Sequence, residues 1–315
     1  MSHICSHPAT TSSGKLHAND LRTTLQSLDI HRIDTAARYQ DGESEKTIGA
    51  ASFPKDFTID TKIKFWFPGD GTLTSSAIET SLTNSLKVLA VEKVNVLYCH
   101  GPDYATHLSE TVKAFDDQYR RGRFTHLGVS NFMPEMLQEY IDICDKEGYV
   151  KPTVYQGHYN LLCRSYEETL FPLLRKNGIA FNAYSPLGGG FLLGNFTTEG
   201  HQSGSRFATQ GGMYNNFYDR PALHEAVAKL RAISEKSGLG MDELSLRWLK
   251  FHSILGDEDG MILGASKLPY IEKNHAQLGK GPLEESVAKQ LDALFTDDVK
   301  LAATEVVDSK KMVGR

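Results

Sequence analysis

A regular alternation of short apolar runs and longer helical patterns limits how this 315-residue chain can fold. Seven apolar runs are typical of buried strands, and they begin near residues 30, 57, 94, 124, 153, 179 and 260. Such alternation predicts a parallel sheet, and seven or eight units favour a closed (β/α)8 TIM barrel over an open doubly wound sheet. Because no linker interrupts the pattern, we expect one barrel domain over residues 1–315.

The first strand of this barrel is the hardest to find in the sequence. An eighth strand near the N-terminus is needed for closure, yet the segment from His7 to Gly14 is typical of a loop. Either the first strand is very short, around His3 to Ser6, or it is incomplete because the chain is truncated. The second case would leave the edges of two neighbouring strands exposed and would lower stability.

Other segments also bear on the fold. Residues 187–220 are rich in Gly, Ser and Asn and are too long for an ordinary connection, which indicates a functional segment. A helix is expected over residues 73–90, with Thr72 or Thr74 as a candidate N-cap. The tail after residue 297 has only a weak pattern.

Composition and charge exclude several classes of partner. The net charge is −5, and acidic and basic residues are mixed along the chain without the basic stripe that suits nucleic acid. No apolar run is long enough to span a membrane, and the first twenty residues lack the apolar centre of a signal peptide. The four cysteines have no metal-type spacing, so we expect reduced thiols in a cytoplasmic protein.

Polar side chains of complementary chemistry lie at the ends of three consecutive predicted strands. The strand over residues 30–35 reaches Asp34 near its end and leads to Tyr39, the next strand reaches Lys62, and the third ends on His100. The C-terminal ends of parallel barrel strands share one mouth, where the chemistry of such barrels takes place. We therefore expect these four side chains to converge on one site.

These four residue types suit the protonation of a carbonyl oxygen. A tyrosine, with a pKa of about 10, is a useful general acid only if that pKa is lowered. A Lys62 ammonium beside Tyr39 would lower it, and Asp34 would hold Lys62 and balance its charge. His100 could orient the carbonyl oxygen. Each residue alone also has an ordinary structural interpretation, such as a loop anchor, a solvated charge or a core aromatic, and it is their joint placement that favours chemistry.

Several separated motifs, in the same order along the chain, resemble the aldo-keto reductase family. These motifs are Asp34-Thr35-Ala36 with Tyr39, Gly42-Glu43-Ser44-Glu45, Thr61-Lys62, Tyr98-Cys99-His100-Gly101-Pro102-Asp103 and Gly128-Val129-Ser130-Asn131-Phe132. Within the family, the chain is most similar to the aflatoxin-aldehyde reductase branch. The resemblance extends from about residue 18 to about residue 280.

The resemblance implies a (β/α)8 barrel and an oxidoreductase that reduces aldehydes or ketones with NADPH and without a metal. It also implies a role for each residue at the strand ends. Tyr39 is the proton donor, Lys62 and Asp34 tune it, and His100 orients the carbonyl. A hydride from the nicotinamide would reach the carbonyl carbon, and Tyr39 would protonate the oxygen.

The resemblance further implies a cofactor site at the later strand ends. The nicotinamide amide is expected to meet Ser130, Asn131 and Gln156, because a carboxamide needs both donors and acceptors. The nicotinamide ring is expected to stack on Tyr184, and the glycines that follow would let backbone amides approach the pyrophosphate. The residues expected along the rest of the cofactor are Ser185, Leu187, Gly189, Arg206, Gly264, Ser266, Lys267 and Asn274.

One departure from the family pattern concerns the choice of cofactor. Many relatives place a Lys where Gly264 stands and an Arg or Gln where Tyr270 stands, in the segment implied to hold the adenosine 2′-phosphate. The residues that could compensate for these missing side chains are Ser266, Lys267, Lys273 and Arg206. We therefore expect NADP rather than NAD.

The partner expected at the barrel mouth is a small carbonyl compound, with no nucleic acid or membrane. Trp66 and Tyr218 are expected to contact it together with Tyr39 and His100, and such aromatic side chains suit a bulky or aromatic aldehyde or ketone. Alternatively, the aromatic residues only pack between the long loop and the barrel. The protein could also form a homodimer, which the sequence neither indicates nor excludes.

Two other functions stay open at this point. Potassium-channel β-subunits, which are relatives, illustrate a regulatory or scaffold subunit that binds the cofactor and has little turnover. An aldolase that uses Lys62 as a Schiff base is a third interpretation. The complete set of polar residues at the strand ends favours catalysis over the scaffold.

Overall fold

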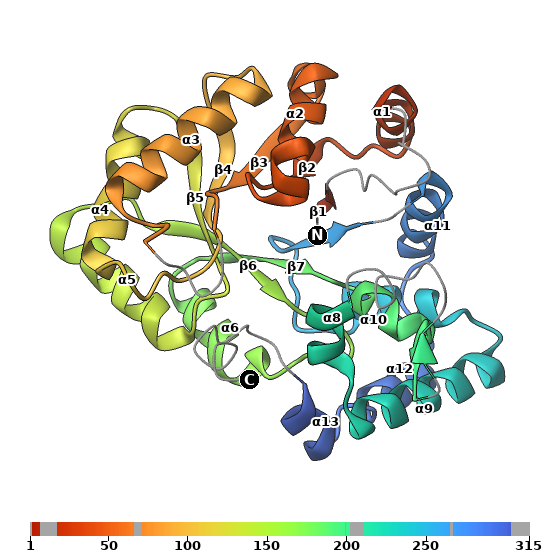
Figure 1. Ribbon diagram of the computed structural model, residues 1–315. Helices are drawn as coiled ribbons and strands as arrows, with labels where there is room; N and C mark the ends of the chain where they lie inside the picture. Colours follow the sequence, from red (N-terminus) through yellow and green to blue (C-terminus); the bar gives the residue numbers. More distant parts are fainter. Residues whose placement is uncertain are drawn as a thin grey trace.

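A closed barrel of parallel strands forms the centre of the protein (Figure 1). The computed structural model describes residues 2–6, 18–65, 71–198, 200–201, 211–264 and 267–303. In the order in which they pair around the barrel, the strands are β1 (Ser2–Ser6), β10 (Gly260–Leu263), β7 (Ala180–Tyr184), β6 (Pro152–His158), β5 (Phe124–Ser130), β4 (Val94–Cys99), β3 (Thr58–Lys62) and β2 (Arg32–Asp34). The predicted (β/α)8 barrel is therefore confirmed.

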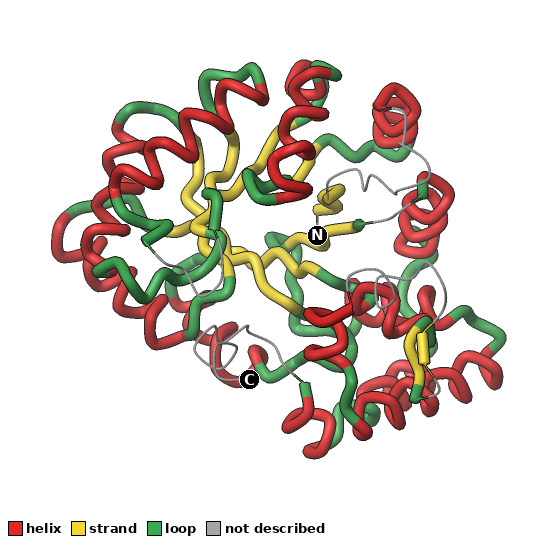
Figure 2. Tube along the Cα trace, in the orientation of Figure 1, coloured by secondary structure: helices red, strands yellow, loops and turns green. Residues whose placement is uncertain are grey.

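Helices surround the strands on the outside (Figure 2). Those that alternate with the barrel strands are α1 (Ala18–Ser27), α2 (Glu43–Ala50), α3 (Ser75–Leu89), α4 (Leu108–Arg120), α5 (Pro134–Glu147), α6 (Tyr166–Lys176) and α11 (Leu268–Leu278). Those that lie between β7 and β10 or after α11 are α8 (Gly211–Tyr218), α9 (Pro221–Ser237), α10 (Met241–Phe251), α12 (Glu285–Asp292) and α13 (Asp297–Ala302). Apolar residues between strands and helices form the main core.

The first strand is present and short, which confirms the expectation of a short strand near His3 to Ser6. β1 pairs with β10 from Ser2 to Cys5 and with β2 at Cys5 and Ser6. It therefore joins the two strands whose edges would otherwise be open. The alternative of a missing first strand is wrong for this barrel.

Threonine hydroxyls cap the starts of two helices. The Thr74 hydroxyl, rather than that of Thr72, accepts a hydrogen bond from the Ala77 backbone amide at 3.3 Å and caps α3. The sequence after residue 297 has only a weak pattern, yet α13 begins at Asp297. The hydroxyl of Thr296 caps this helix by accepting from the Val299 amide at 3.3 Å.

The long segment after β7 contains more structure than its composition predicts. It begins with the 3-10 turn η3 (Gly188–Leu193) and continues with a small hairpin of β8 (Phe196–Thr197) and β9 (Gly200–His201). α8 follows and ends at Tyr218, which packs back against the barrel. Gly, Ser and Asn indicate turns but do not show where a chain returns to the core.

Alternate residues of each strand point into the barrel, and this period of two decides what its interior contains. Ile33 and Ile59 join the outer core against the helices, whereas Tyr98 lies in a separate interior cluster with Val96. The Tyr98 ring fills the space beside β5, because a Cβ atom at Gly128 would lie only 2.3 Å from it. The polar side chains of β2 and β3 that face inward are therefore held against a packed aromatic ring.

Candidate active site

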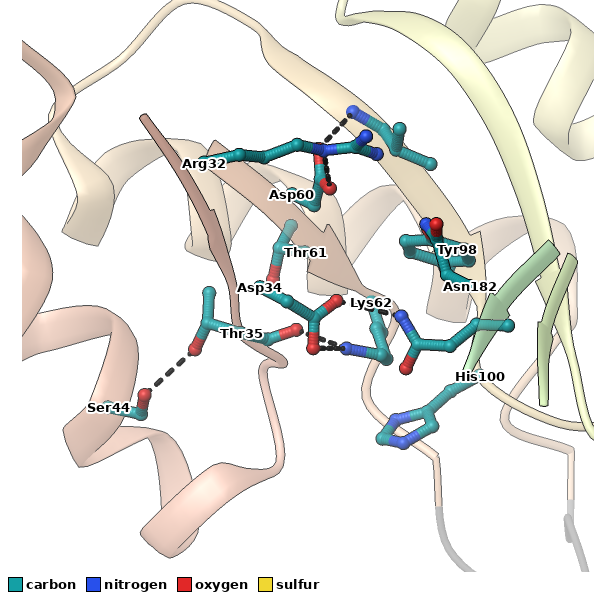
Figure 3. A network of polar contacts seen from close by, with 12 residues as sticks. Arg32, Asp34, Thr35, Ser44, Asp60, Thr61, Lys62, Tyr98, His100 and Asn182 are labelled. Atoms are coloured by element: carbon teal, nitrogen blue, oxygen red, sulfur yellow. Dashed lines mark hydrogen bonds and ion pairs between the residues drawn. The ribbon is translucent and has the colours of Figure 1, made fainter. Parts of the chain in front are cut away.

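The centre of the site is a buried ion pair between neighbouring strands. The Lys62 ammonium at the end of β3 lies 2.6 Å from the Asp34 carboxylate at the end of β2 and donates to the Thr35 carbonyl at 2.8 Å (Figure 3). Both side chains are almost fully buried. Two charges withdrawn from water in this way need each other and additional hydrogen bonds to be stable. The pair is therefore fixed in position.

Tyr39 lies beside this ion pair at the barrel mouth. It begins the 3-10 turn η1 (Tyr39–Gly42) directly after β2, and its ring centre is 5.1 Å from the Lys62 nitrogen. The ring also meets the His100 ring edge to face, with 5.8 Å between centroids. The four side chains expected to converge are thus brought together, although they come from three strand ends and a loop.

The charge on Lys62 is strongly supported by its neighbours. Burial by itself lowers the pKa of Lys62, but the charges of Asp34 and Tyr39 and the hydrogen bond to Asp34 outweigh it, so that the pKa is raised. Lys62 is therefore an ammonium at neutral pH. A Schiff-base lysine has to be neutral to attack a carbonyl, so this environment opposes the aldolase alternative.

His100 is held in its neutral form. Burial lowers its pKa well below the usual value, and the nearby charges of Lys62 and Arg38 lower it further, although a hydrogen bond to the Ile63 backbone acts in the opposite direction. Its Nδ1 atom is buried and has no hydrogen-bond partner among the described residues. A neutral imidazole can donate from one nitrogen and accept at the other.

Gln156 connects the ion pair with the expected cofactor side. Its amide Nε2 donates to the second Asp34 oxygen at 2.9 Å, so that one carboxylate holds both Lys62 and Gln156. Gln156 pairs in register with Ser130, which ends the adjacent strand β5. Both side chains are buried at the same end of the barrel.

Asn131 and Tyr184 form a second polar connection at the mouth. The Tyr184 hydroxyl donates to the Asn131 side-chain oxygen at 2.9 Å, and the Asn131 amide donates to the His100 carbonyl at 2.9 Å. Asn131 has a φ of 61°, in the left-handed region that asparagine tolerates better than most residues. The Tyr184 ring is half-buried and stacks in parallel on His158, with centroids 5.4 Å apart.

The turn after β7 contains several residues in the left-handed backbone region. Ser185, Gly188 and Gly189 have φ values of 55°, 61° and 66°, and Leu187 lies between them, half-buried. The Gly188 and Gly190 amides donate to the Ser185 and Leu187 carbonyls at 2.9 and 3.0 Å. Turns of this kind can present other backbone amides to a phosphate group. The two glycines adopt this conformation without the penalty that a Cβ atom brings.

The remaining cofactor candidates lie around β10 and α11. Gly264 follows β10 and is exposed, and Lys267 is exposed directly before α11, whereas Asn274 is buried on that helix. The Lys273 ammonium lies 2.5 Å from the Asp242 carboxylate of α10, so its charge is already balanced. Trp66, Arg206 and Ser266 lie outside the described residues.

Tyr218 is placed by the structure as a packing residue of the mouth. Its side chain is only 1% exposed, its ring stacks on Phe191 at 4.8 Å, and its hydroxyl lies 2.6 Å from His158 Nε2. This position fits the alternative in which the aromatic residues pack between the long segment and the barrel. Its expected contact with a substrate remains a prediction.

Sequence reasoning missed His158 as a member of this network. His158 ends β6, two residues after Gln156, and so it faces the same side of the strand. Asn160 extends the contact, since its amide lies 3.3 Å from His158 Nε2 and donates to the Ser185 carbonyl at 3.1 Å. The period of two along this strand was the signal that could have found it.

The Gly42-Glu43-Ser44-Glu45 motif is part of the resemblance to the aldo-keto reductase family, and the structure shows which contacts its side chains make. The Ser44 hydroxyl lies 2.8 Å from that of Thr35 (Figure 3). The buried Glu45 carboxylate accepts hydrogen bonds from Thr61 and Ser85. These contacts connect α2 to the ends of β2 and β3 and to α3, and they therefore hold both ends of the segment that carries Tyr39.

In the described part of the chain, none of the helices combines the length and apolarity that a membrane crossing requires. Across the same residues, no three His, Cys, Asp or Glu side chains gather closely enough to bind a metal ion.

Comparison with known proteins gives the family. The model of the aldo/keto reductase family matches residues 8–295. "Oxidoreductase sirO" of Leptosphaeria maculans is 34% identical, with 91% of this chain and 87% of that protein covered. Human "Aldo-keto reductase family 7 member A3" and human "Aflatoxin B1 aldehyde reductase member 4" are 36% and 35% identical, each with 81% of both chains covered. Members of the family generally use NAD(P)H. The chain therefore belongs to the aldo/keto reductase family and is an oxidoreductase.

Proposed function

We propose that this protein reduces an aldehyde or ketone to an alcohol with NADPH, and that Tyr39 supplies the proton. The observation that carries the proposal is the buried Lys62 ammonium, bound to Asp34 and lying 5.1 Å from the centre of the Tyr39 ring. A fixed positive charge beside a phenol favours loss of the phenolic proton, which is what a general acid requires.

The proton transfer follows from the charges in the site. When a carbonyl oxygen gains negative charge, the Tyr39 hydroxyl donates its proton to that oxygen, and the phenolate that remains is stabilised by Lys62. Asp34 keeps the ammonium in place, and its second oxygen is held by Gln156. The buried pair needs little rearrangement during this step, because its partners are already in place.

His100 has the proposed role of orienting the substrate oxygen. Its pKa lies well below the usual value because of burial and the nearby cations, so it is neutral in this role and does not compete with Tyr39 as an acid. Its ring contacts that of Tyr39, which places both side chains beside the same small volume. A hydrogen bond from each side chain would fix the direction of the carbonyl group.

The donor set at the later strand ends fits a nicotinamide cofactor. Ser130, Asn131 and Gln156 offer the donors and acceptors that its carboxamide needs, and Tyr184 offers a half-buried ring. When bound, NADPH supplies the hydride that reaches the carbonyl carbon. The left-handed turn after Tyr184 would hold the phosphates.

We further propose NADPH over NADH and an aldehyde as the substrate class. Lys267 is exposed directly before α11, where its cation would favour a 2′-phosphate. Lys273, by contrast, is neutralised by Asp242. One relative reported above, human "Aflatoxin B1 aldehyde reductase member 4", is named for the reduction of aflatoxin B1 aldehyde, which supports a bulky aldehyde here.

The Tyr39→Phe variant tests the proposal most directly. We expect the turnover number for a panel of aldehydes, followed by the loss of reduced-nicotinamide absorbance, to fall about 100-fold to 10,000-fold, because the ring remains but the proton donor is gone. The affinity of the Tyr39→Phe variant for NADPH, measured by the fluorescence of the cofactor, should change little.

Tyr119→Phe is the matched control, because Tyr119 is exposed on α4 and should keep full activity. Full turnover by the Tyr39→Phe variant would contradict the role of Tyr39. Tight NADPH binding by the wild-type protein with no carbonyl reduced would instead favour the scaffold alternative.

A further inference from the structure

A second ion pair lies next to the Lys62–Asp34 pair, and it joins a fully buried carboxylate to a partly exposed guanidinium. The Arg32 Nε atom at the start of β2 donates to an Asp60 oxygen in β3 at 2.6 Å (Figure 3). The other Asp60 oxygen accepts from the Asn95 side chain at 2.7 Å and from the Val96 backbone amide at 3.1 Å. Asp60 is completely buried. Neither Arg32 nor Asp60 is among the residues proposed to contact the substrate or the cofactor, so the pair needs another explanation.

The register of the barrel places two carboxylates side by side. Asp34 of β2 and Asp60 of β3 are partners in the parallel pairing, and both face the interior. Neighbouring strands are about 4.8 Å apart, so two carboxylates in register repel each other strongly. Each carboxylate therefore needs a cation of its own, because a second anion nearby raises the pKa of the first and competes for the same cation.

The chain provides one cation for each carboxylate. Arg32, two residues before Asp34, binds Asp60, and Lys62, two residues after Asp60, binds Asp34. Along each strand a positive and a negative side chain therefore alternate on the inner face. The hydrogen bonds from Asn95 and the Val96 amide also hold the Asp60 carboxylate in this orientation, away from Lys62.

We propose that Arg32 and Asp60 are positioning residues: by neutralising Asp60, Arg32 leaves the Lys62 ammonium bound to Asp34 and directed at Tyr39. If Arg32 is lost, the unpaired Asp60 carboxylate competes with Asp34 for Lys62 and draws positive charge away from the phenol. The importance of this arrangement for turnover rests on the proposed function. The effect on Tyr39 itself does not.

The surrounding charges agree with this interpretation. Burial raises the pKa of Asp60, while the Arg32 charge and the Asn95 hydrogen bond oppose the rise and the Asp34 charge adds to it. The charged and titratable groups that act on Lys62, Asp60 or their immediate neighbours, from all elements packed around them, are Arg32, Asp34, Arg38, Tyr39, Glu45, Tyr98 and His100.

The test measures the ionisation of Tyr39 in the full-length protein without cofactor. NMR of ring-labelled tyrosine, with the signal assigned by the Tyr39→Phe variant, gives its titration midpoint. We expect Arg32→Met to raise this midpoint by about one pH unit, because it leaves an uncompensated anion, and Asp60→Asn to lower it. The Arg32→Met/Asp60→Asn double variant should return to within a few tenths of a unit of wild type, since no net charge has been removed.

Arg175 and Asp259 provide a matched control elsewhere in the barrel. Asp259 is also fully buried, binds the partly exposed Arg175 through both oxygens at 2.5 and 3.0 Å, and accepts from the Phe181 amide at 2.7 Å. Arg175→Met should lower the melting temperature as Arg32→Met does, while the Tyr39 midpoint stays where it is.

The opposite signs separate an electrostatic role from a structural one. If Arg32→Met and Asp60→Asn both fold and shift the midpoint in the same direction, or leave it unchanged, the proposal is wrong. If Arg32→Met does not fold, the other two variants still test the proposal. It is then wrong if Asp60→Asn does not lower the Tyr39 midpoint, or if the double variant does not return it to the wild-type value.

Kinetics provide the second readout. With a carbonyl substrate, Arg32→Met should reduce kcat about tenfold with little change in KM, and the double variant should recover most of this loss. If the wild-type protein reduces no carbonyl, the proposed function fails, and the NMR measurement still decides the positioning role.

Discussion

Glu45 shows how a residue far from the reacting atoms can still shape the site. Its carboxylate is almost fully buried in α2, and burial raises its pKa, although hydrogen bonds from Thr61 and Ser85 and the charge of Lys62 oppose the rise. An acid whose pKa is raised by folding stabilises the protein below its unfolded pKa of about 4.3 and loses that contribution as the pH rises. At neutral pH, the buried charge therefore has a cost.

Glu45→Gln and Glu45→Ala should therefore differ. The glutamine keeps the size and an acceptor oxygen, so its melting temperature relative to wild type should be higher at pH 7 than at pH 4. The alanine leaves the Thr61 and Ser85 hydroxyls without this partner and should cost about 1–3 kcal/mol at both pH values. Calorimetry at the two pH values measures this, and a Glu45→Gln effect independent of pH would contradict it.

At this scale, part of the site could be predicted from the sequence. Asp34, Lys62 and His100 could be assigned to one mouth because parallel strands end on the same side of a barrel. Arg32 and Asp60 could not be assigned, because a strand-borne charge shows its partner only when the register is known. The sequence indicates which residues face inward, but not which pairs they form.

At the scale of elements, α10 and α11 are joined by buried acids at the start of α10. Asp242 binds Lys273 at 2.5 Å and Gln277 at 3.0 Å, both on α11, and Glu243 binds Lys280 at 2.6 Å. Burial alone would raise the pKa of each acid, but the cations and hydrogen bonds outweigh it and lower the pKa. This contribution to stability is present above the unfolded pKa and is lost as the pH falls through the folded one.

Asp242→Asn should therefore lower the melting temperature at pH 7 by about 2–4 °C, a modest amount because Lys273 is largely exposed to solvent. The difference from wild type should shrink as the pH falls from 7 toward about 2, because the contribution of the wild-type carboxylate is lost as the pH passes below its lowered folded pKa. Thermal unfolding followed by circular dichroism at both pH values provides the measurement.

Glu285→Gln is the control, because its pair with Lys289 on α12 is exposed on both sides and should contribute little at either pH. An equal effect of this substitution, or an Asp242→Asn difference that persists in acid, would show that the buried pair is not responsible.

The elements that could be predicted are those with a strong period and a clear end. α3 lies within its expected range, 73–90, because apolar spacing and a capping threonine agree there. η1 and the β8–β9 hairpin were not expected, since such short turns have little periodicity. α13 was missed because six residues are too few to show a helical repeat.

At the scale of the whole molecule, β1 decides whether the barrel is closed. Its backbone pairs with β10 on one side and with β2 on the other, and β2 carries Asp34. Loss of this strand would leave two parallel edges without partners next to the Lys62–Asp34 ion pair. Closure and the geometry of the site are therefore coupled through β2.

Ile4→Pro tests this coupling, because proline removes a backbone donor in the middle of β1, where Ile4 pairs with Ile262. We expect a melting temperature about 5 °C or more below that of Ile4→Ala, which keeps the donor, together with more light scattering on heating as the open edges associate. Aldehyde turnover below the melting temperature should fall as well, since β2 loses the neighbour that orients Asp34. Equal melting temperatures for the two variants would mean that pairing through β1 contributes nothing to closure, and the stability of the barrel would have to come from its other strand pairs and the helices around them.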